Sequence, residues 1–154
     1  MSERLNSLEG TCGHPRLVPF LEKRTFDFTN LFAGATNNDI SIVLCPAFCV
    51  LDYNWVRLSV RVHALSMALT SSQALSFFVY GAMPSEEDPT QEFVDETSTF
   101  LRVDISSGVS VPSLISATGT SPDAYLRIVL RATQTSSPAT LTAQLSACLL
   151  LRPH

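Results

Sequence analysis

The side chains of this chain best suited to nucleophilic or metal chemistry are its histidines and cysteines. A hydrolytic triad needs a serine or cysteine beside a histidine that an acid orients, and none of the histidines lies in a local motif of that kind. The chain also has no glycine-rich phosphate loop of either common spacing. We therefore predict that the protein is not an enzyme and uses no cofactor. The residues concerned are His14, His63, His154, Cys12, Cys45, Cys49 and Cys148.

Four of these residues form the best candidate metal site. Thiolates and imidazoles are the ligands that zinc prefers, and Cys12 and His14 could join Cys45 and Cys49 around one ion. Against this, Cys45 and Cys49 lack the spacing of a zinc knuckle and lie in apolar surroundings. We expect free, buried thiols and no metal, as in a protein that stays in a reducing compartment.

An acidic stretch over residues 84–96 is a second candidate for a metal, because calcium prefers several carboxylate oxygens. The stretch lacks the residue pattern of a calcium-binding loop. A run of like charges without that pattern is typical of a solvated loop, which is our prediction here. Its acidic residues, with no basic residue among them, are Glu86, Glu87, Asp88, Glu92, Asp95 and Glu96.

Composition limits the class of partner. Of the 154 residues, 45% are hydrophobic and only 16% are charged, against about 25% charged in typical soluble domains. The formal net charge is -4 and the basic residues are scattered, which argues against a dedicated nucleic-acid binder. No apolar run reaches the roughly 18 residues that would cross a bilayer. We expect other protein subunits to cover part of this weakly charged surface, with no direct contact to nucleic acid or membrane.

The scaffold that positions these residues is predicted to consist of strands. Apolar residues alternate with other residues at every second position over residues 40–45, 55–63, 75–80, 100–105, 125–132 and 141–151. Turns rich in Gly, Pro, Ser and Asn separate these stretches, and no convincing amphipathic helix is present. In the clearest case, Val56, Leu58, Val60 and Val62 alternate with Trp55, Arg57, Ser59, Arg61 and His63. The predicted fold is all-β, an antiparallel β-sandwich of the jelly-roll type, with a β-barrel as the alternative.

Residues 1–30 are predicted to be an extended N-terminal arm, and residues 31–154 a single sandwich domain. Gly10, Gly13, Pro15 and Pro19 interrupt any long periodicity in this segment. It carries too many apolar residues for a disordered tail, so we expect the arm to lie either on its own domain or on a neighbouring subunit. The aromatic residues of the arm that could make this contact are Phe20, Phe26 and Phe28.

The outward faces of the predicted strands carry aromatic and arginine side chains, the types enriched at interface cores. If those strands are neighbours, their rings and guanidiniums would form one protein-binding patch. A glycan platform built from Trp55, Phe78 and Tyr80 is the alternative. Together with the aromatic residues of the arm, the predicted interface comprises Phe20, Phe26, Phe28, Trp55, Arg57, Arg61, Phe78, Tyr80, Tyr125, Arg127 and Arg131.

In its alternation over residues 55–63, 75–80, 125–132 and 141–151, and in its N-terminal arm, the chain resembles small β-sandwich accessory proteins of tailed phages. The resemblance covers the pattern of about the last three quarters of the chain and includes no family-specific motif. It implies a capsid-decoration or tail-associated structural protein, a homo-oligomer located in the virion and assembled in the host cytoplasm. The alternative function is a carbohydrate-binding β-sandwich module.

Overall fold

The computed structural model describes residues 15–28, 38–66, 73–84, 92–105, 107–120, 125–134 and 142–153. Within these ranges the chain forms eight strands and no helix. The strands are β1 (Arg16–Asp27), β2 (Asn38–Cys49), β3 (Tyr53–Leu65), β4 (Gln73–Pro84), β5 (Glu92–Ile105), β6 (Ser113–Thr120), β7 (Tyr125–Gln134) and β8 (Thr142–Pro153). No stretch of these residues forms a helix that could cross a membrane.

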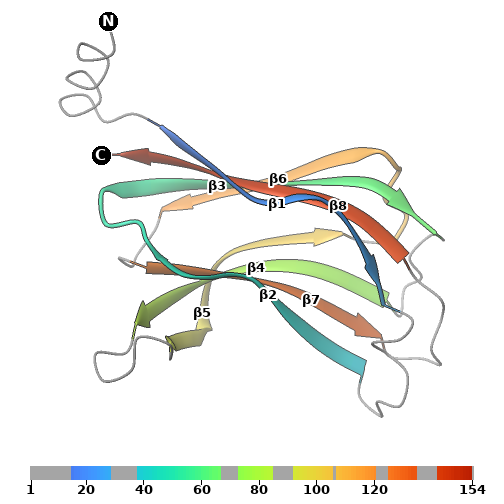
Figure 1. Ribbon diagram of the computed structural model, residues 1–154, viewed down its shortest axis with the longest axis horizontal. Helices are drawn as coiled ribbons and strands as arrows, with labels where there is room; N and C mark the ends of the chain where they lie inside the picture. Colours follow the sequence, from blue (N-terminus) through green and yellow to red (C-terminus); the bar gives the residue numbers. More distant parts are fainter. Residues whose placement is uncertain are drawn as a thin grey trace, which may run out of the picture.

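The strands form two antiparallel four-stranded sheets that face each other (Figure 1). One sheet has the order β1-β8-β3-β6 and the other the order β2-β7-β4-β5. Strands that follow one another in the chain therefore mostly lie in opposite sheets, which is the arrangement of an eight-stranded jelly roll. The predicted fold class, an antiparallel sandwich of jelly-roll type, is confirmed.

Strand β3 is central to the first sheet because β8 and β6 pair with its two sides. Its alternation places Val56, Leu58, Val60 and Val62 in the core, each fully buried. Opposite them, β4 and β7 contribute inward residues such as Phe77, Ile128 and Leu130 to the same core. The two-residue period of these strands thus produces one closed core between the sheets.

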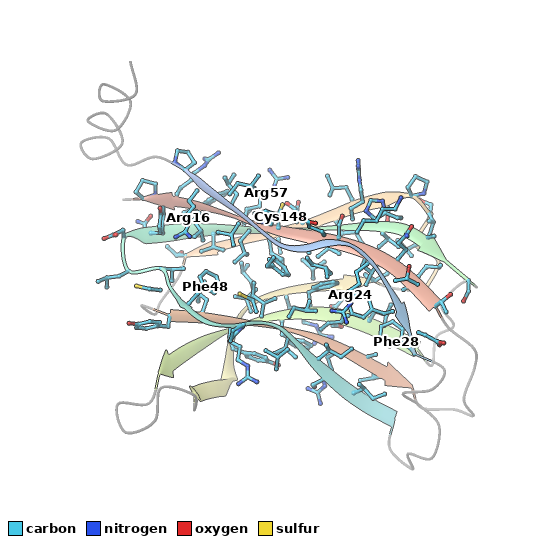
Figure 2. All side chains as sticks on the ribbon, in the orientation of Figure 1. Arg16, Arg24, Phe28, Phe48, Arg57 and Cys148 are labelled. Carbon is cyan, nitrogen blue, oxygen red and sulfur yellow. The ribbon has the colours of Figure 1, made fainter. Side chains whose placement is uncertain are left out.

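The described part of the predicted arm lies on the sandwich itself. Residues 16–27 form β1, which pairs with β8 along the edge of the first sheet. Phe26 and Phe28 are buried in the core and their rings stack with centroids 6.0 Å apart. Figure 2 shows Phe28 in the space between the two sheets. Residues 1–14, the remainder of the arm, lie outside the described residues.

Pro19 and Pro46 lie in the interior of strands, and both of these strands are at the edge of a sheet. The sequence predicts that the strand over residues 40–45 stops at Pro46, whereas β2 continues to Cys49. The register of β2 shifts between Cys45 and Phe48, on either side of Pro46. Pro19 of β1 lies within a similar shift. An edge strand with an irregular register does not need every N–H for its ladder, so it can contain proline.

The structure also corrects the expectations for β5 and β6. Glu92, Asp95 and Glu96, expected in a solvated loop, lie in β5, which begins well before residue 100. Residues 85–91 of that stretch lie outside the described residues. Strand β6 extends to Thr120 through a region expected to be mostly connection. Its inward positions are only half-buried and do not need large apolar side chains, which is why the sequence alternates only weakly there.

Candidate functional site

The predicted Arg-aromatic patch divides between the two outer faces of the sandwich. Trp55, Arg57 and Arg61 lie on β3, in the first sheet. The second sheet carries Phe78 and Tyr80 on β4, and Tyr125, Arg127 and Arg131 on β7. We call the outer side of β1-β8-β3-β6 the groove face, and the outer side of β2-β7-β4-β5 the arginine face. Strand β3, which carries Trp55, and strand β4, which carries Phe78 and Tyr80, lie in opposite sheets. These three rings therefore form no single platform for a glycan.

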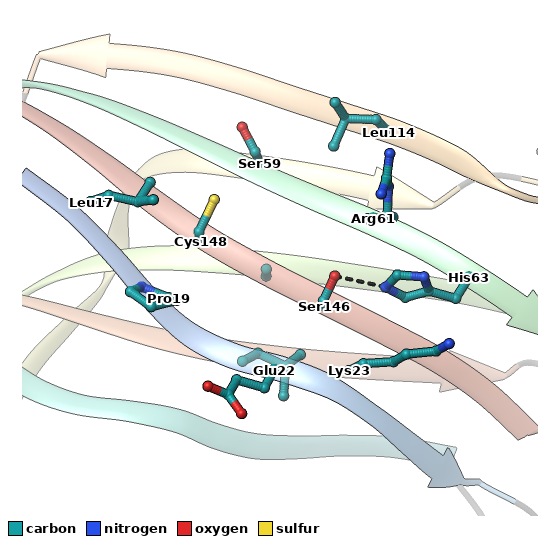
Figure 3. A pocket seen from close by; sticks show the side chains of 12 residues that line it. Leu17, Pro19, Glu22, Lys23, Ser59, Arg61, His63, Leu114, Ser146 and Cys148 are labelled. Atoms are coloured by element: carbon teal, nitrogen blue, oxygen red, sulfur yellow. Dashed lines mark hydrogen bonds between the residues drawn. The ribbon is translucent and has the colours of Figure 1, made fainter.

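A groove of about 410 Å³ runs across the groove face. Figure 3 shows Leu17 of β1 and Leu114 of β6 on opposite sides of it, with Ser59, Ser146 and Cys148 between them. Longer side chains also line the groove, namely Glu22 and Lys23 of β1 and Arg61 and His63 of β3. Leu17 and Leu114 are 61% and 60% exposed. The groove therefore combines the exposed leucines Leu17 and Leu114 with charged side chains around a few small residues.

One polar pair in the groove could in principle carry chemistry. His63 Nε2 and Ser146 Oγ share a hydrogen bond of 2.8 Å, drawn as the dashed line in Figure 3. Ser146 lies within β8, which pairs with strands on both sides. Backbone N–H groups in such a strand point along the sheet to its neighbours, so they do not face the groove as donors to an oxyanion. The pair is better explained as two polar groups that satisfy each other on a partly covered face.

Trp55 and Arg57, two other predicted residues of the groove face, also contact neighbouring side chains. The Arg152 guanidinium lies over the Trp55 ring, 4.5 Å from its centroid. Arg57 donates a hydrogen bond from Nη2 to Ser116 Oγ at 3.2 Å. Figure 2 shows Arg57 and Cys148 on the outer side of the first sheet. Trp55 is half-buried, whereas Arg57 and Arg61 are exposed.

On the arginine face, Phe78 and Tyr80 stack almost parallel, with centroids 5.6 Å apart and an interplanar angle of 4°. With Val129 they form a small apolar cluster separate from the core. The guanidinium carbons of Arg102 and Arg131 lie 4.9 Å and 6.0 Å from the Phe78 centroid. The rings are only 8% and 5% exposed, so little of their area is open to a flat ligand.

A hydrogen-bonded group fixes one of these guanidiniums. Arg102 Nε donates to Asp104 Oδ1 at 2.6 Å, and Ser76 Oγ donates to the same oxygen at 2.6 Å. Ser76 is almost fully buried, whereas Arg102 and Asp104 are about half exposed. A hollow of about 210 Å³ lies here, lined by Ala74, Ser76, Phe78, Arg102, Arg131 and Thr133.

The remaining predicted residues have different positions. Phe26 and Phe28 are core residues and not surface contacts in this structure, because β1 belongs to the sheet. Phe20 is partly buried against the core. Tyr125 and Arg127 are half-buried at the end of β7 that pairs with Cys49.

The thiol prediction is confirmed in part. Cys45, Cys49 and Cys148 form no disulfide, as expected, but none of them is fully buried: Cys45 and Cys148 are half-buried, and Cys49 is exposed at the end of an edge strand. Cys12 and His14 lie outside the described residues. Within the part of the chain that the structure describes, no three His, Cys, Asp or Glu side chains gather as a metal site would require.

Sequence reasoning did not identify Arg102, Asp104, Leu17, Leu114 or Ser146 as site residues. Arg102 and Asp104 were detectable, because both alternate with the apolar residues of the predicted strand over residues 100–105. Leu17 and Leu114 carry no such signal, since an isolated leucine in an irregular segment does not indicate which side it faces.

No family model and no curated protein matches the sequence. Among solved structures, the chain is similar to a chain of infectious bursal disease virus, Gx strain, with a TM-score of 0.53 and 8% identity over 92% of this chain and 32% of the viral chain. It also matches the VP2 subviral particle of that virus, with a TM-score of 0.49 and 10% identity over 92% and 33% of the two chains.

A third match is a Clostridium thermocellum xylanase 10B structure containing CBM22-1 and GH10 modules, with a TM-score of 0.39 and 15% identity over 89% of this chain and 27% of that one. This chain spans about a third of the length of the viral chains it matches. At such identities the similarity to the Gx strain chain shows a shared β-sandwich fold.

Proposed function

We propose that this protein is a structural subunit of a viral particle and acts by binding other protein subunits through its outer sheet faces. The observation that carries the proposal is the exposure of Leu17 and Leu114 beside a groove, on a sandwich whose own core is already closed. Burying those leucines would contribute nothing to the core of this chain. A subunit contact would remove them from water, which is the usual role of apolar side chains grouped on a surface.

Two further observations support a structural role. The fold is shared with a chain in a structure of infectious bursal disease virus, and only 16% of the residues are charged. The His63 and Ser146 pair in the groove lies on β3 and β8, which pair with each other so that their backbone N–H groups point along the sheet, and this favours a role in binding over catalysis. Decoration of a capsid or attachment to a tail is the finer role that the phage resemblance implies, with a virion location and assembly in the host cytoplasm.

The proposal is tested by charging the groove margins. Leu17→Glu and Leu114→Glu would place a carboxylate at each margin, where a partner could bury it only at a high cost. We expect the double variant to lose higher-order species in sedimentation velocity while its melting temperature stays near that of the wild type. Leu51→Glu is the matched control, because Leu51 is 67% exposed and lies in the turn between β2 and β3, away from the groove.

Equal association by the wild type and the groove variant would refute the groove face as the contact surface. If Leu51→Glu abolishes association as effectively as the double variant, the effect is one of added charge and not of position.

A further inference from the structure

Strand β6 differs from the other edge strands of the sandwich in lacking features that block strand pairing. Proteins usually protect an edge strand with prolines, charged residues or register shifts. β1 and β2 contain Pro19 and Pro46 and have irregular registers, and β5 carries charged residues such as Arg102 and Asp104. β6 has no proline and no charged residue, and its register with β3 has no shift. Among the edge strands, β6 is therefore the one best suited to accept a further strand.

One side of β6 is paired by no strand among the residues that the structure describes. β6 pairs with β3 and ends the first sheet at the margin opposite β1 (Figure 1). In an antiparallel pair, alternate residues direct their N–H and C=O groups to the partner, so every second residue of β6 directs them away from β3. β6 is 8 residues long, which is roughly 27 Å at the rise of a strand. This length is sufficient for a complete antiparallel pairing with another strand.

The inward side chains of β6 are incompletely covered in a single copy. Ile115 and Ala117 are only half-buried against the core. Their partners on β3, Val60 and Leu58, are fully buried because β3 has a strand on each side. A further strand beside β6 gives Ile115 and Ala117 similar cover, and the burial of their apolar area favours association.

We infer that β6 of one copy pairs antiparallel with β6 of a second copy, about a twofold axis perpendicular to the sheet. The strand is complementary to itself in this arrangement. With the axis at Ser116, Ile115 lies opposite Ala117 and Leu114 lies opposite Thr118, so each larger apolar side chain meets a smaller one. An axis at Ala117 likewise sets the two apolar residues opposite a glycine and a threonine. No two charged residues of β6 oppose each other, since the strand has none.

This pairing deepens the proposed function, on which it rests, by naming a contact between identical subunits. It joins the first sheets of two copies into one continuous sheet, and a twofold contact of this kind closes on itself. The outermost strands of the joined sheet are the two copies of β1, whose proline and irregular register oppose further addition. Both groove faces then lie on the same side, with each Leu114 next to the junction.

The test is a charge exchange on the full-length protein, measured by sedimentation velocity. One variant carries Ser116→Lys and Thr118→Lys, and the other carries Ser116→Glu and Thr118→Glu, at two exposed positions. With the axis at either residue, like charges then lie directly opposite each other, which is unfavourable. We expect each variant alone to associate roughly fivefold or more weakly than the wild type. An equimolar mixture should recover association, because lysines of one copy then face glutamates of the other.

The matched control carries Thr25→Lys and Ser41→Lys, which add the same two charges at exposed positions of β1 and β2. This control should associate as the wild type does. Hydrogen exchange on the wild type covers the case in which the charged variants fail to fold, as judged by thermal denaturation. Amides of residues 113–120 should exchange more slowly at high protein concentration than at low concentration, whereas those of residues 16–27 should not change.

The outcomes separate this inference from the proposed function. If the wild type associates and the lysine variant associates equally well, or if exchange over residues 113–120 does not depend on concentration, the β6 contact is overturned and the proposed function stands. If both variants lose association and their mixture does not recover it, β6 binds a different segment, and the pairing of two β6 strands is again overturned. A monomeric wild type would overturn both proposals.

Discussion

Replacement of Phe28 by alanine tests whether the start of the chain is part of the sandwich. Phe28 follows β1, is fully buried in the core and stacks on Phe26. Truncating a buried phenylalanine removes its transfer free energy and leaves a cavity, a loss of about 3 to 5 kcal/mol. For a domain of this size, each kcal/mol lowers the melting temperature by about 2 to 4 °C. Phe28→Ala should therefore melt between about 6 and 20 °C below the wild type.

Differential scanning calorimetry measures this shift. Thr25→Ala is the matched control, because Thr25 is exposed on β1 and makes only a long contact, 3.5 Å, from Gln144 Nε2 to its Oγ1. That change should alter the free energy of unfolding by less than about 0.5 kcal/mol. Equal melting temperatures for Phe28→Ala and the wild type would show that residues 16–28 do not contribute to the core, and would restore the simpler interpretation of a detachable arm.

The same reasoning predicts the outcome of other changes. Deleting residues 1–28 removes the buried side chains of Leu21, Phe26 and Phe28, a loss of about 10 kcal/mol in all at the usual cost per side chain. This is comparable to the whole stability of a domain, so we expect circular dichroism to show no cooperative unfolding transition. Deletion of residues 1–14 keeps every described strand and should preserve the cooperative transition. Val60→Asp places an unpaired charge between Ala147 and Ile115 in the core and should lower the free energy of unfolding by about 4 kcal/mol or more, as measured in urea. Ser59→Asp, on the outer side of the sheet, should lower it by about 1 kcal/mol or less. Similar urea midpoints for both variants would contradict the assignment of faces. Gly108→Ala should cost about 1 kcal/mol because Gly108 has φ of 84°, although no atom lies within 4 Å of an added Cβ; an unchanged urea midpoint would show that this turn tolerates a side chain.

The fold class could be predicted from sequence because local periodicity determines which side of a strand is buried. The stretch from Val56 to Val62 illustrates this, since apolar residues at every second position, three of them β-branched valines, specify both a strand and its inward face. Strand β6 illustrates the opposite case. Its Ser, Ala, Thr and Gly residues give little contrast between faces, and the strand forms because β3 provides a partner along its length.

The candidate site could not be predicted in the same way because strand order is not a local property. Trp55 and Phe78 both point outward from their strands, but the jelly-roll connection places β3 and β4 in opposite sheets. One predicted patch therefore becomes two faces. For the same reason, Leu17 and Leu114, far apart in the sequence, line one groove.

The measurement that tests the central claim most directly is the native mass of the wild-type protein across a range of concentrations, for example by sedimentation velocity. A chain of 16.8 kDa that acts as an assembly subunit should form a defined higher-order species as concentration rises. A single monomeric species at every concentration and salt condition would contradict the proposed structural role.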